Sequence, residues 1–182
     1  SSAAMRTTAQ LGILRCSYYT DNIAATIEVA TRLIEQENLA EEIRQEAMYC
    51  RAKSHLKEKQ YGLAIVDLTP ISKEVRTIIG AEAKYELANC YFQLGAIDMA
   101  EQEVMSFMQM QTTQQYWLAK SMILLADINL QRNDTFQAKQ YLLALQANYK
   151  QTDDIQTIVA EKLVALETIK EETPELEEED TL

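Results

Sequence analysis

The stretch "LANCYFQLGAIDMA", Leu87 to Ala100, decides how the chain folds. It sets one glycine, Gly95, between two helix-forming segments. Glycine tolerates the left-handed backbone that ends a helix, so Gly95 predicts a turn. On its two sides, Ala88 and Ala100 supply small side chains where two helices can approach closely. The stretch is therefore interpreted as the junction of two packed helices.

The two alanines recur along the chain in a fixed register. The segments "EAMYCRAKSHLKEKQYGLAIVDL" from Glu46, "EAKYELANCYFQLGAIDMAEQEV" from Glu82 and "KSMILLADINLQRNDTFQAKQYL" from Lys120 align without a gap. Two columns then hold only alanine: Ala52, Ala88 and Ala126 in one, and Ala64, Ala100 and Ala138 in the other. The two alanines lie twelve residues apart in every copy, while successive copies are offset by 36 and then 38 residues. The spacing within a unit is constant, and only the length of the connection between units varies.

Each copy predicts two antiparallel helices joined by a short turn. Apolar residues follow each second alanine at plus four and plus seven, the spacing of one helical face. They are Leu68 and Ile71, Val104 and Phe107, and Leu142 and Leu145. In the turns "QLGAID" and "QRNDTF", Gly95 and Asn133 share a column. Both residue types tolerate left-handed backbone, which predicts a helix end at this column.

These units resemble the tetratricopeptide repeat (TPR), a helix-turn-helix unit of about 34 residues that stacks into a superhelix. The pattern of that family is met best by Ala88, Tyr91, Gly95, Ala100 and Val104. The other copies depart from it, because the usual early aromatic residue is replaced and the closing proline is missing. An unrelated helical bundle is the alternative.

The expected fold is all-α, an α–α superhelix of about nine helices in antiparallel pairs with a C-terminal capping helix. The TPR-like domain covers residues 1–170, with pairs over 4–37, 40–75, 77–111 and 113–150 and the cap over 152–170. The second helix of the first pair should bury Ile23, Ile27, Ala30 and Ile34. The cap should start at Thr152 as N-cap, with Asp153 and Asp154 in its first turn, and bury an apolar face that ends at Ile169.

Charge and composition exclude several classes of function. The formal net charge is −11, but residues 171–182 hold seven acidic residues and no basic one. That segment predicts a disordered acidic tail. The remaining chain is only mildly acidic and has no stripe of Lys and Arg, which argues against nucleic-acid binding. No apolar run approaches the ~20 residues of a membrane span.

Catalytic and metal chemistry has no candidate set in this sequence. His55 is the only histidine. Its column also holds Tyr91 and Asn129, which favours a packed or surface role. Cys16, Cys50 and Cys90 are far apart and never in a CxxC spacing, so each is expected to pack as a small buried hydrophobe. We expect no enzyme, no cofactor and no metal site.

The resemblance implies that function lies in the concave groove lined by the first helix of each pair. Its groove positions two, five, nine, twelve and thirteen are counted here from Gln45, Ala81 and Ala119. We take as the partner-binding groove Tyr49, Lys53, Lys57, Tyr85, Asn89, Phe92, Gln93, Asp127 and Gln131. Such columns also contact the next pair of helices, which is the structural alternative for each of them. The expected partner is a protein or a peptide.

Two further expectations concern assembly and context. The segment from Met5 to Tyr19 has an apolar face without an evident partner, so self-association into a homo-oligomer is the alternative function. Residues 80–170, with "QYWLAKSMILLADI" and "FQAKQYLLAL", look like the C-terminal end of long TPR arrays of the Gram-negative envelope. That resemblance implies a terminal piece of a longer array and favours the periplasm, with the cytoplasm as the alternative. Binding of chaperone tails is not expected, because only Asn89 matches the clamp of that branch.

Overall fold

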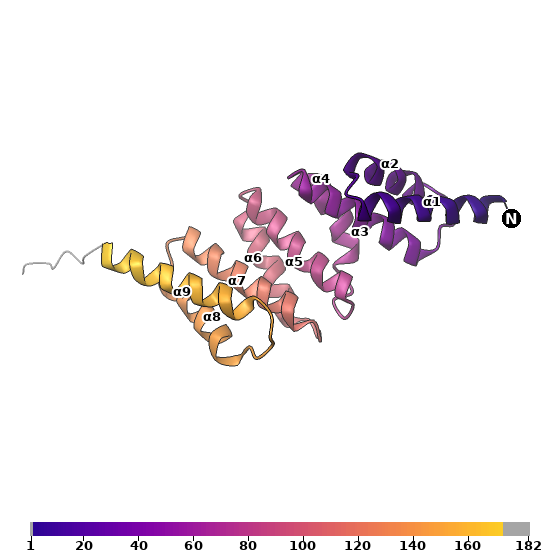
Figure 1. The fold of residues 1–182 in the computed structure, drawn as a ribbon. Helices are drawn as coiled ribbons and strands as arrows, with labels where there is room; N and C mark the ends of the chain where they lie inside the picture. Colours follow the sequence, from indigo (N-terminus) through magenta and orange to yellow (C-terminus); the bar gives the residue numbers. More distant parts are fainter. Residues whose placement is uncertain (1, 173–182) are drawn as a thin grey trace, which may run out of the picture. The chain divides into compact units, whose positions relative to one another are not determined.

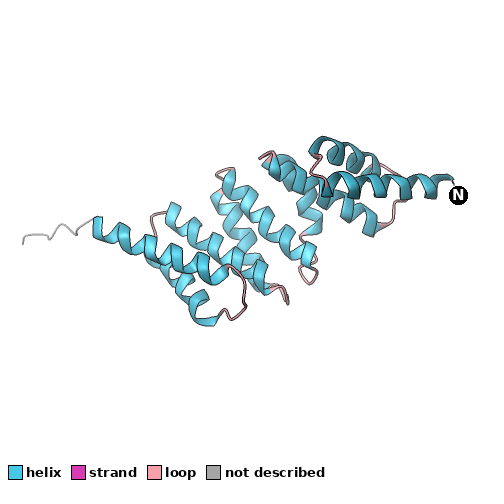
Figure 2. Cartoon of the chain, viewed as in Figure 1, coloured by secondary structure: helices cyan, strands magenta, loops and turns pink. Residues whose placement is uncertain are grey.

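The structure is a computed structural model that describes residues 2–172, in which every regular element is an α-helix (Figure 2). The nine helices of these residues are α1 (Ser2–Tyr19), α2 (Ile23–Ile34), α3 (Glu41–Lys57), α4 (Tyr61–Ile71), α5 (Ile78–Gln93), α6 (Ile97–Gln109), α7 (Gln115–Gln131), α8 (Thr135–Asn148) and α9 (Ile155–Glu172) (Figure 1). The all-α fold of paired helices expected from the sequence is confirmed.

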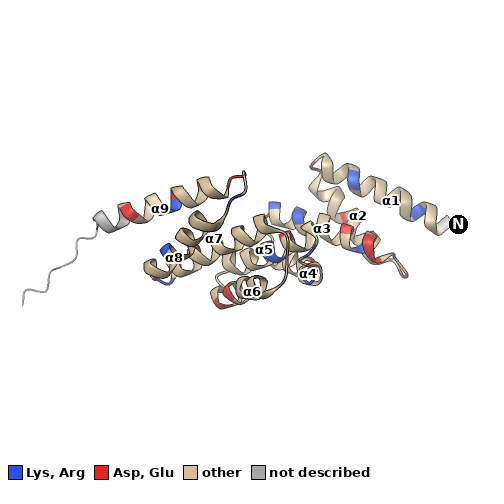
Figure 3. Cartoon of the chain, turned by 90° about the horizontal axis from the view of Figure 1, so that it is seen from below, with Lys and Arg blue, Asp and Glu red and all other residues tan. Residues whose placement is uncertain are grey.

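The chain divides into two units, residues 1–118 and residues 119–182. In the first unit each helix from α1 to α5 packs on the next one, and α1 also packs on α3. In the second unit α8 packs on α9. Basic and acidic residues are scattered along the helices of both units, and no helix of the described residues carries a continuous stripe of one sign (Figure 3).

Four turns share one backbone geometry, and each follows the first helix of a pair. Their left-handed residues are Asp21, Lys59, Gly95 and Asn133, with φ values of 59°, 57°, 75° and 62°. In the third turn the Ala96 N–H donates to the Tyr91 carbonyl at 2.9 Å, and the Gly95 N–H donates to the Phe92 carbonyl. The same two bonds close the other three turns. This is the Schellman arrangement that satisfies the last carbonyls of a helix. The predicted turns at Gly95 and Asn133 are confirmed.

The alanine columns lie where the paired helices touch. All six alanines are fully buried. In the first pair Leu14 and Thr26 occupy the equivalent columns, and both are buried as well. Thr26 can be buried because its hydroxyl donates to the Asn22 carbonyl at 2.8 Å. The small side chains are therefore architectural.

The predicted buried face of α2 is wrong. The buried residues are Thr26, Val29, Ala30 and Leu33, whereas the isoleucines at 23, 27 and 34 are only half-buried. The predicted and the observed buried faces share Ala30 and differ by a small rotation about the helix axis. The rotation arises because α2 packs on both α1 and α3, and the shared register places Thr26, Ala30 and Leu33 in the columns of Ala64, Leu68 and Ile71.

The start of the capping helix is also corrected. Helix α9 begins at Ile155, so Asp153 and Asp154 precede its first turn and Thr152 is not its N-cap. The Asp153 carboxylate accepts from the Ile155 N–H at 3.1 Å, and the Asp154 carbonyl accepts the first helical bond, from Ile158. Of its expected face, Ile155, Val159, Leu163 and Leu166 are buried and Ile158 is half-buried, whereas the side chain of Ile169 lies outside the described residues. Of the expected tail, residues 171 and 172 end α9, and residues 173–182 lie outside the described residues.

The cysteines follow the prediction at two of three positions. Cys50 and Cys90 are buried, and burial raises the pKa of each thiol to about 12. Cys16 is exposed, so its expected burial is wrong. The reason is its place on the side of α1 that faces neither α2 nor α3.

Candidate functional site

A cleft of about 380 Å³ opens in the first unit between α1, α3 and the connection from α4 to α5. We call it the tyrosine cleft. Its aromatic lining comes from Tyr18 and Tyr19 of α1 and Tyr49 of α3. Its other lining residues are Arg15, Glu42, Gln45, Glu46, Cys50, Ile71, Glu74, Thr77 and Ile79. The volume lies within the range typical of sites that hold small molecules or single peptide side chains.

The tyrosines form a connected aromatic wall. The ring centres of Tyr18 and Tyr49 lie 6.4 Å apart, and those of Tyr18 and Tyr19 lie 5.8 Å apart, edge to face. The Tyr49 hydroxyl donates to Glu82 of α5 at 2.9 Å. Burial and the adjacent Glu82 carboxylate raise the pKa of Tyr49 well above its usual range. The phenol is therefore neutral and acts as a donor.

Most charges around the cleft are paired. The Arg15 guanidinium holds the Glu46 carboxylate with two bonds of 2.6 and 2.8 Å. Glu74 accepts two bonds from the Arg76 guanidinium, and this neighbour lowers the pKa of Glu74 to about 2. Glu42 is exposed and forms no ion pair within the described part of the chain.

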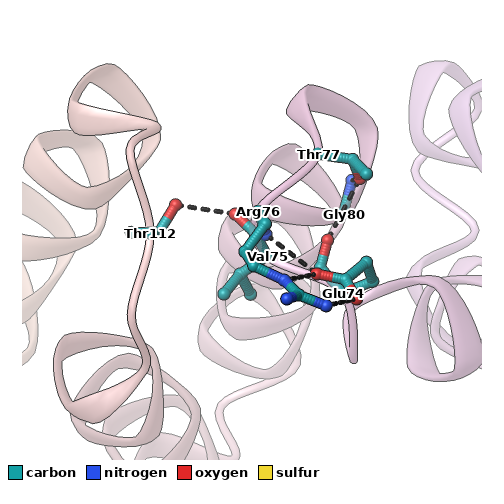
Figure 4. Close-up of polar contacts among 6 residues, drawn as sticks. All are labelled: Glu74, Val75, Arg76, Thr77, Gly80 and Thr112. Atoms are coloured by element: carbon teal, nitrogen blue, oxygen red, sulfur yellow. Dashed lines mark hydrogen bonds and ion pairs between the residues drawn. The ribbon is translucent and has the colours of Figure 1, made fainter.

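The connection that carries Glu74 is fixed by hydrogen bonds within it, to the start of α5 and to Thr112 (Figure 4). The Gly80 N–H donates to the Thr77 hydroxyl oxygen at 3.0 Å, which caps α5. The Thr112 hydroxyl donates to the Val75 carbonyl at 2.6 Å. Val75 is buried in a cluster with Ala81 and Phe107. This wall of the cleft is therefore held by α5 and by the chain beyond α6.

The predicted groove residues of α3 make contacts with its neighbours. Besides Tyr49, the Lys53 ammonium lies 2.6 Å from Glu82 and 3.2 Å from Glu86. Lys57 pairs with Asp21 in the first turn and lies 5.9 Å from the Tyr18 ring centre, a cation–π contact. These three predicted residues thus lie on one face that joins α1, α3 and α5.

The other predicted groove residues are distributed more widely. On α5 the Tyr85 ring lies 5.7 Å from the Trp117 ring, and Asn89 receives a bond from Gln93 at 3.4 Å. Phe92 is half-buried and Gln93 is exposed. In the second unit, Lys162 of α9 donates to Asp127, and Gln131 is exposed. Only Tyr49 of the predicted set lines the tyrosine cleft.

Sequence reasoning missed Arg15, Tyr18 and Tyr19, although the register contains them. The offset of 38 residues that relates Asp21 to Lys59 also relates these three residues to Lys53, Leu56 and Lys57. They therefore occupy groove positions nine, twelve and thirteen of the first pair. The missing signal was the alanine columns, which hold Leu14 and Thr26 in that pair.

Neither protein-family models nor curated proteins give a match to this chain. Among the described residues, no three His, Cys, Asp or Glu side chains gather into a set that could hold a metal ion. His55 is packed, and its Nδ1 lies 2.7 Å from Gln60 Oε1. Within the described part of the chain, no helix has the length and apolar character needed to cross a membrane.

Proposed function

We propose that this chain is a non-catalytic protein-interaction scaffold of the TPR type, which binds a segment of a partner protein on the face formed by the first helices. The single observation that carries the proposal is the tyrosine cleft, at groove positions of the first two pairs. The four equivalent turns support the TPR resemblance. The envelope of a Gram-negative bacterium is the compartment that the same resemblance favours.

The cleft has the physical character of a binding site for a peptide side chain. Tyrosine combines a rigid apolar ring with a polar tip and loses little conformational entropy on binding. The walls are preformed by helices and by capped turns, which reduces the ordering that binding would require on the receptor side. A cavity of this size accommodates one or two large side chains of an extended or helical segment.

The test is a selection of displayed random peptides on the immobilised full chain. Peptides enriched on the chain are then measured for affinity to a Tyr19→Ala variant. Tyr19 is 83% exposed, so its removal leaves the core intact. The matched control is Phe136→Ala, which removes a side chain that is 73% exposed in the second unit.

We expect the Tyr19→Ala change to weaken binding by about tenfold, the scale of an interface residue that contributes more than 1 kcal/mol. The Phe136→Ala change should leave affinity unchanged. Absence of enriched peptides, or equal binding to both variants, would reject the cleft as the partner site.

Self-association is the second candidate, and one observation favours it. Met5 and Ile13 on α1 are 68% and 53% exposed, and a Cβ added at Gly12 would meet no atom within 4 Å. This helix face has room for a second copy of the chain. Light scattering coupled to size exclusion measures the mass directly. A dimer that an Ile13→Glu variant dissolves would support this candidate, whereas a monomer at high micromolar concentration would reject it.

A further inference from the structure

We propose that the tyrosine cleft selects segments that carry an apolar anchor side chain flanked by basic residues. This inference rests on the proposed binding function and names the chemistry of its partner.

The deepest lining residues of the cleft are apolar. Cys50 and Ile71 are both only 4% exposed. The Tyr18 and Tyr49 rings pack against the cluster that contains Cys50, and Tyr49 also packs against the cluster that contains Ile71. A charged group placed against this floor would lose its hydration without gaining a partner. An aliphatic or aromatic side chain would instead bury apolar surface there, which stabilises the complex. The floor therefore favours an apolar side chain as the anchor of the partner.

The rim of the cleft carries more negative than positive charge. Arg15 faces Glu46 and Arg76 faces Glu74, so these pairs balance. Glu42, at the first turn of α3, adds a carboxylate that no cation of the described residues balances. Residues of the partner on either side of the anchor pass over this rim, where a Lys or Arg side chain is attracted and an acidic one repelled.

The neighbouring face extends the same imbalance. Lys53 serves two carboxylates, Glu82 and Glu86, so the three groups together are negative. If the bound segment continues along α3 and α5, a basic side chain of the partner would neutralise the excess negative charge of this group. The excess of carboxylates therefore continues beyond the cleft along α3 and α5.

An anionic partner is disfavoured by the state of Arg15. It is the only basic residue among those that line the cleft, and its guanidinium is held by Glu46 through two hydrogen bonds. An incoming carboxylate or phosphate would have to displace Glu46 and leave that side chain without its cation. A basic segment requires no such rearrangement.

The test uses three sets of fluorescein-labelled nonapeptides with the full chain. Each set has Leu, Phe or Trp at its centre, and the four neighbouring positions are all Lys, all Gln or all Glu. Fluorescence anisotropy gives the affinity of each set at about 20 mM and about 500 mM salt. The variants are Glu42→Gln and, as matched control, Glu41→Gln. Glu41 is the adjacent exposed carboxylate in the same helical turn and does not line the cleft.

We expect the Lys set to bind about fivefold tighter than the Gln set at low salt, with most of the difference lost at high salt. Glu42→Gln should reduce the preference by about two- to threefold. Glu41→Gln should leave it unchanged, because Glu41 does not line the cleft. It is a matched control because both substitutions remove the same favourable charge at the start of α3.

The outcomes separate the two proposals. Equal or tighter binding of the Gln or Glu sets, or a preference that Glu42→Gln leaves intact, overturns the inference about charge and leaves the binding function standing. No binding of any set, together with no enriched peptide in the selection, overturns the binding function itself.

Discussion

Gly80 lies in the first turn of α5, and its replacement by alanine tests how the connection wall of the cleft is built. A Cβ added at Gly80 would lie 2.0 Å from the Glu74 carbonyl oxygen and 2.7 Å from the Glu74 carbonyl carbon. Real Cβ atoms essentially never approach other atoms within 3.0 Å, so the backbone at Glu74 would have to move by about 1 Å. Moving that backbone lowers the free energy of unfolding.

The magnitude follows from what the displacement disturbs. The Glu74 carbonyl accepts bonds from the Thr77 N–H and hydroxyl, and hydrogen bonds of this kind each contribute about 1 kcal/mol. The next residue, Val75, is 2% exposed and packs with Phe107. Overpacking of a well-filled site costs about 1–3 kcal/mol. Alanine gains up to about 1 kcal/mol of helix propensity over glycine. We predict a net loss of about 1–3 kcal/mol in the free energy of unfolding.

Urea unfolding followed by tryptophan fluorescence measures this change. Trp117 is the only tryptophan and packs against the cluster of Val75 and Phe107, so it reports on the affected region. The matched control is Gly62→Ala in α4, where an added Cβ meets nothing within 4 Å. That change should stabilise the chain by a few tenths to about 1 kcal/mol. A Gly80→Ala protein as stable as the wild type, or more stable, would refute the reasoning.

Three further predictions concern the turns, the thiols and one carboxylate. Lys59 occupies a left-handed position with φ 57°, so Lys59→Gly should raise the free energy of unfolding by about 0.5–1 kcal/mol, measured by urea unfolding, whereas the opposite change Gly95→Ala should lower it by about 1 kcal/mol. A thiol reagent at pH 8 should label Cys16 alone in the folded chain and all three cysteines in denaturant, because the other two thiols are buried; rapid labelling of a second thiol in the native state would contradict the packing. The carboxyl carbon of Glu74, followed by NMR, should titrate near pH 2, since the Arg76 guanidinium favours its ionised form, and the pKa should rise towards its ordinary value in Arg76→Ala, which keeps only the bond from the backbone N–H. The pKa is lower in the folded state, so the stabilisation from this pair is present above pH 4.5 and is lost as the pH falls towards 2.

The parts of the fold that could be predicted from the sequence are those that depend on residue type at a repeated position. Alanine at two fixed sites indicated close helix packing, and Gly95 and Asn133 indicated the turn. Lys59 adopts the same backbone but gave no signal, because lysine has no preference for left-handed conformations. At that position the fold of the pair imposes the conformation on an unfavourable residue.

The cleft could be predicted only in part, because its two walls have different origins. One wall follows the register: Tyr49 was found, and Tyr18 and Tyr19 follow once the register is carried to the first pair. The other wall contains Glu74, which lies in a connection of its own sequence and shape. The repeat pattern does not predict the conformation of a connection. The close approach of Gly80 to Glu74 depends on that conformation, so it could not be predicted from the sequence either.

This division of the walls bears on specificity. The positions of the register recur in every pair, so the first helices offer a partner similar sites along their length. The connection from Ser72 to Thr77 occurs once and lines only the tyrosine cleft. If the connection selects the partner, a change that moves Glu74 should weaken peptide binding more than it weakens the fold. Gly80→Ala provides that comparison, because the atoms nearest to its added Cβ belong to Glu74 and Thr77, whereas Tyr18 and Tyr19 lie on α1 and Tyr49 lies on α3. A folded Gly80→Ala protein that keeps full affinity for enriched peptides would assign recognition to the tyrosine wall alone.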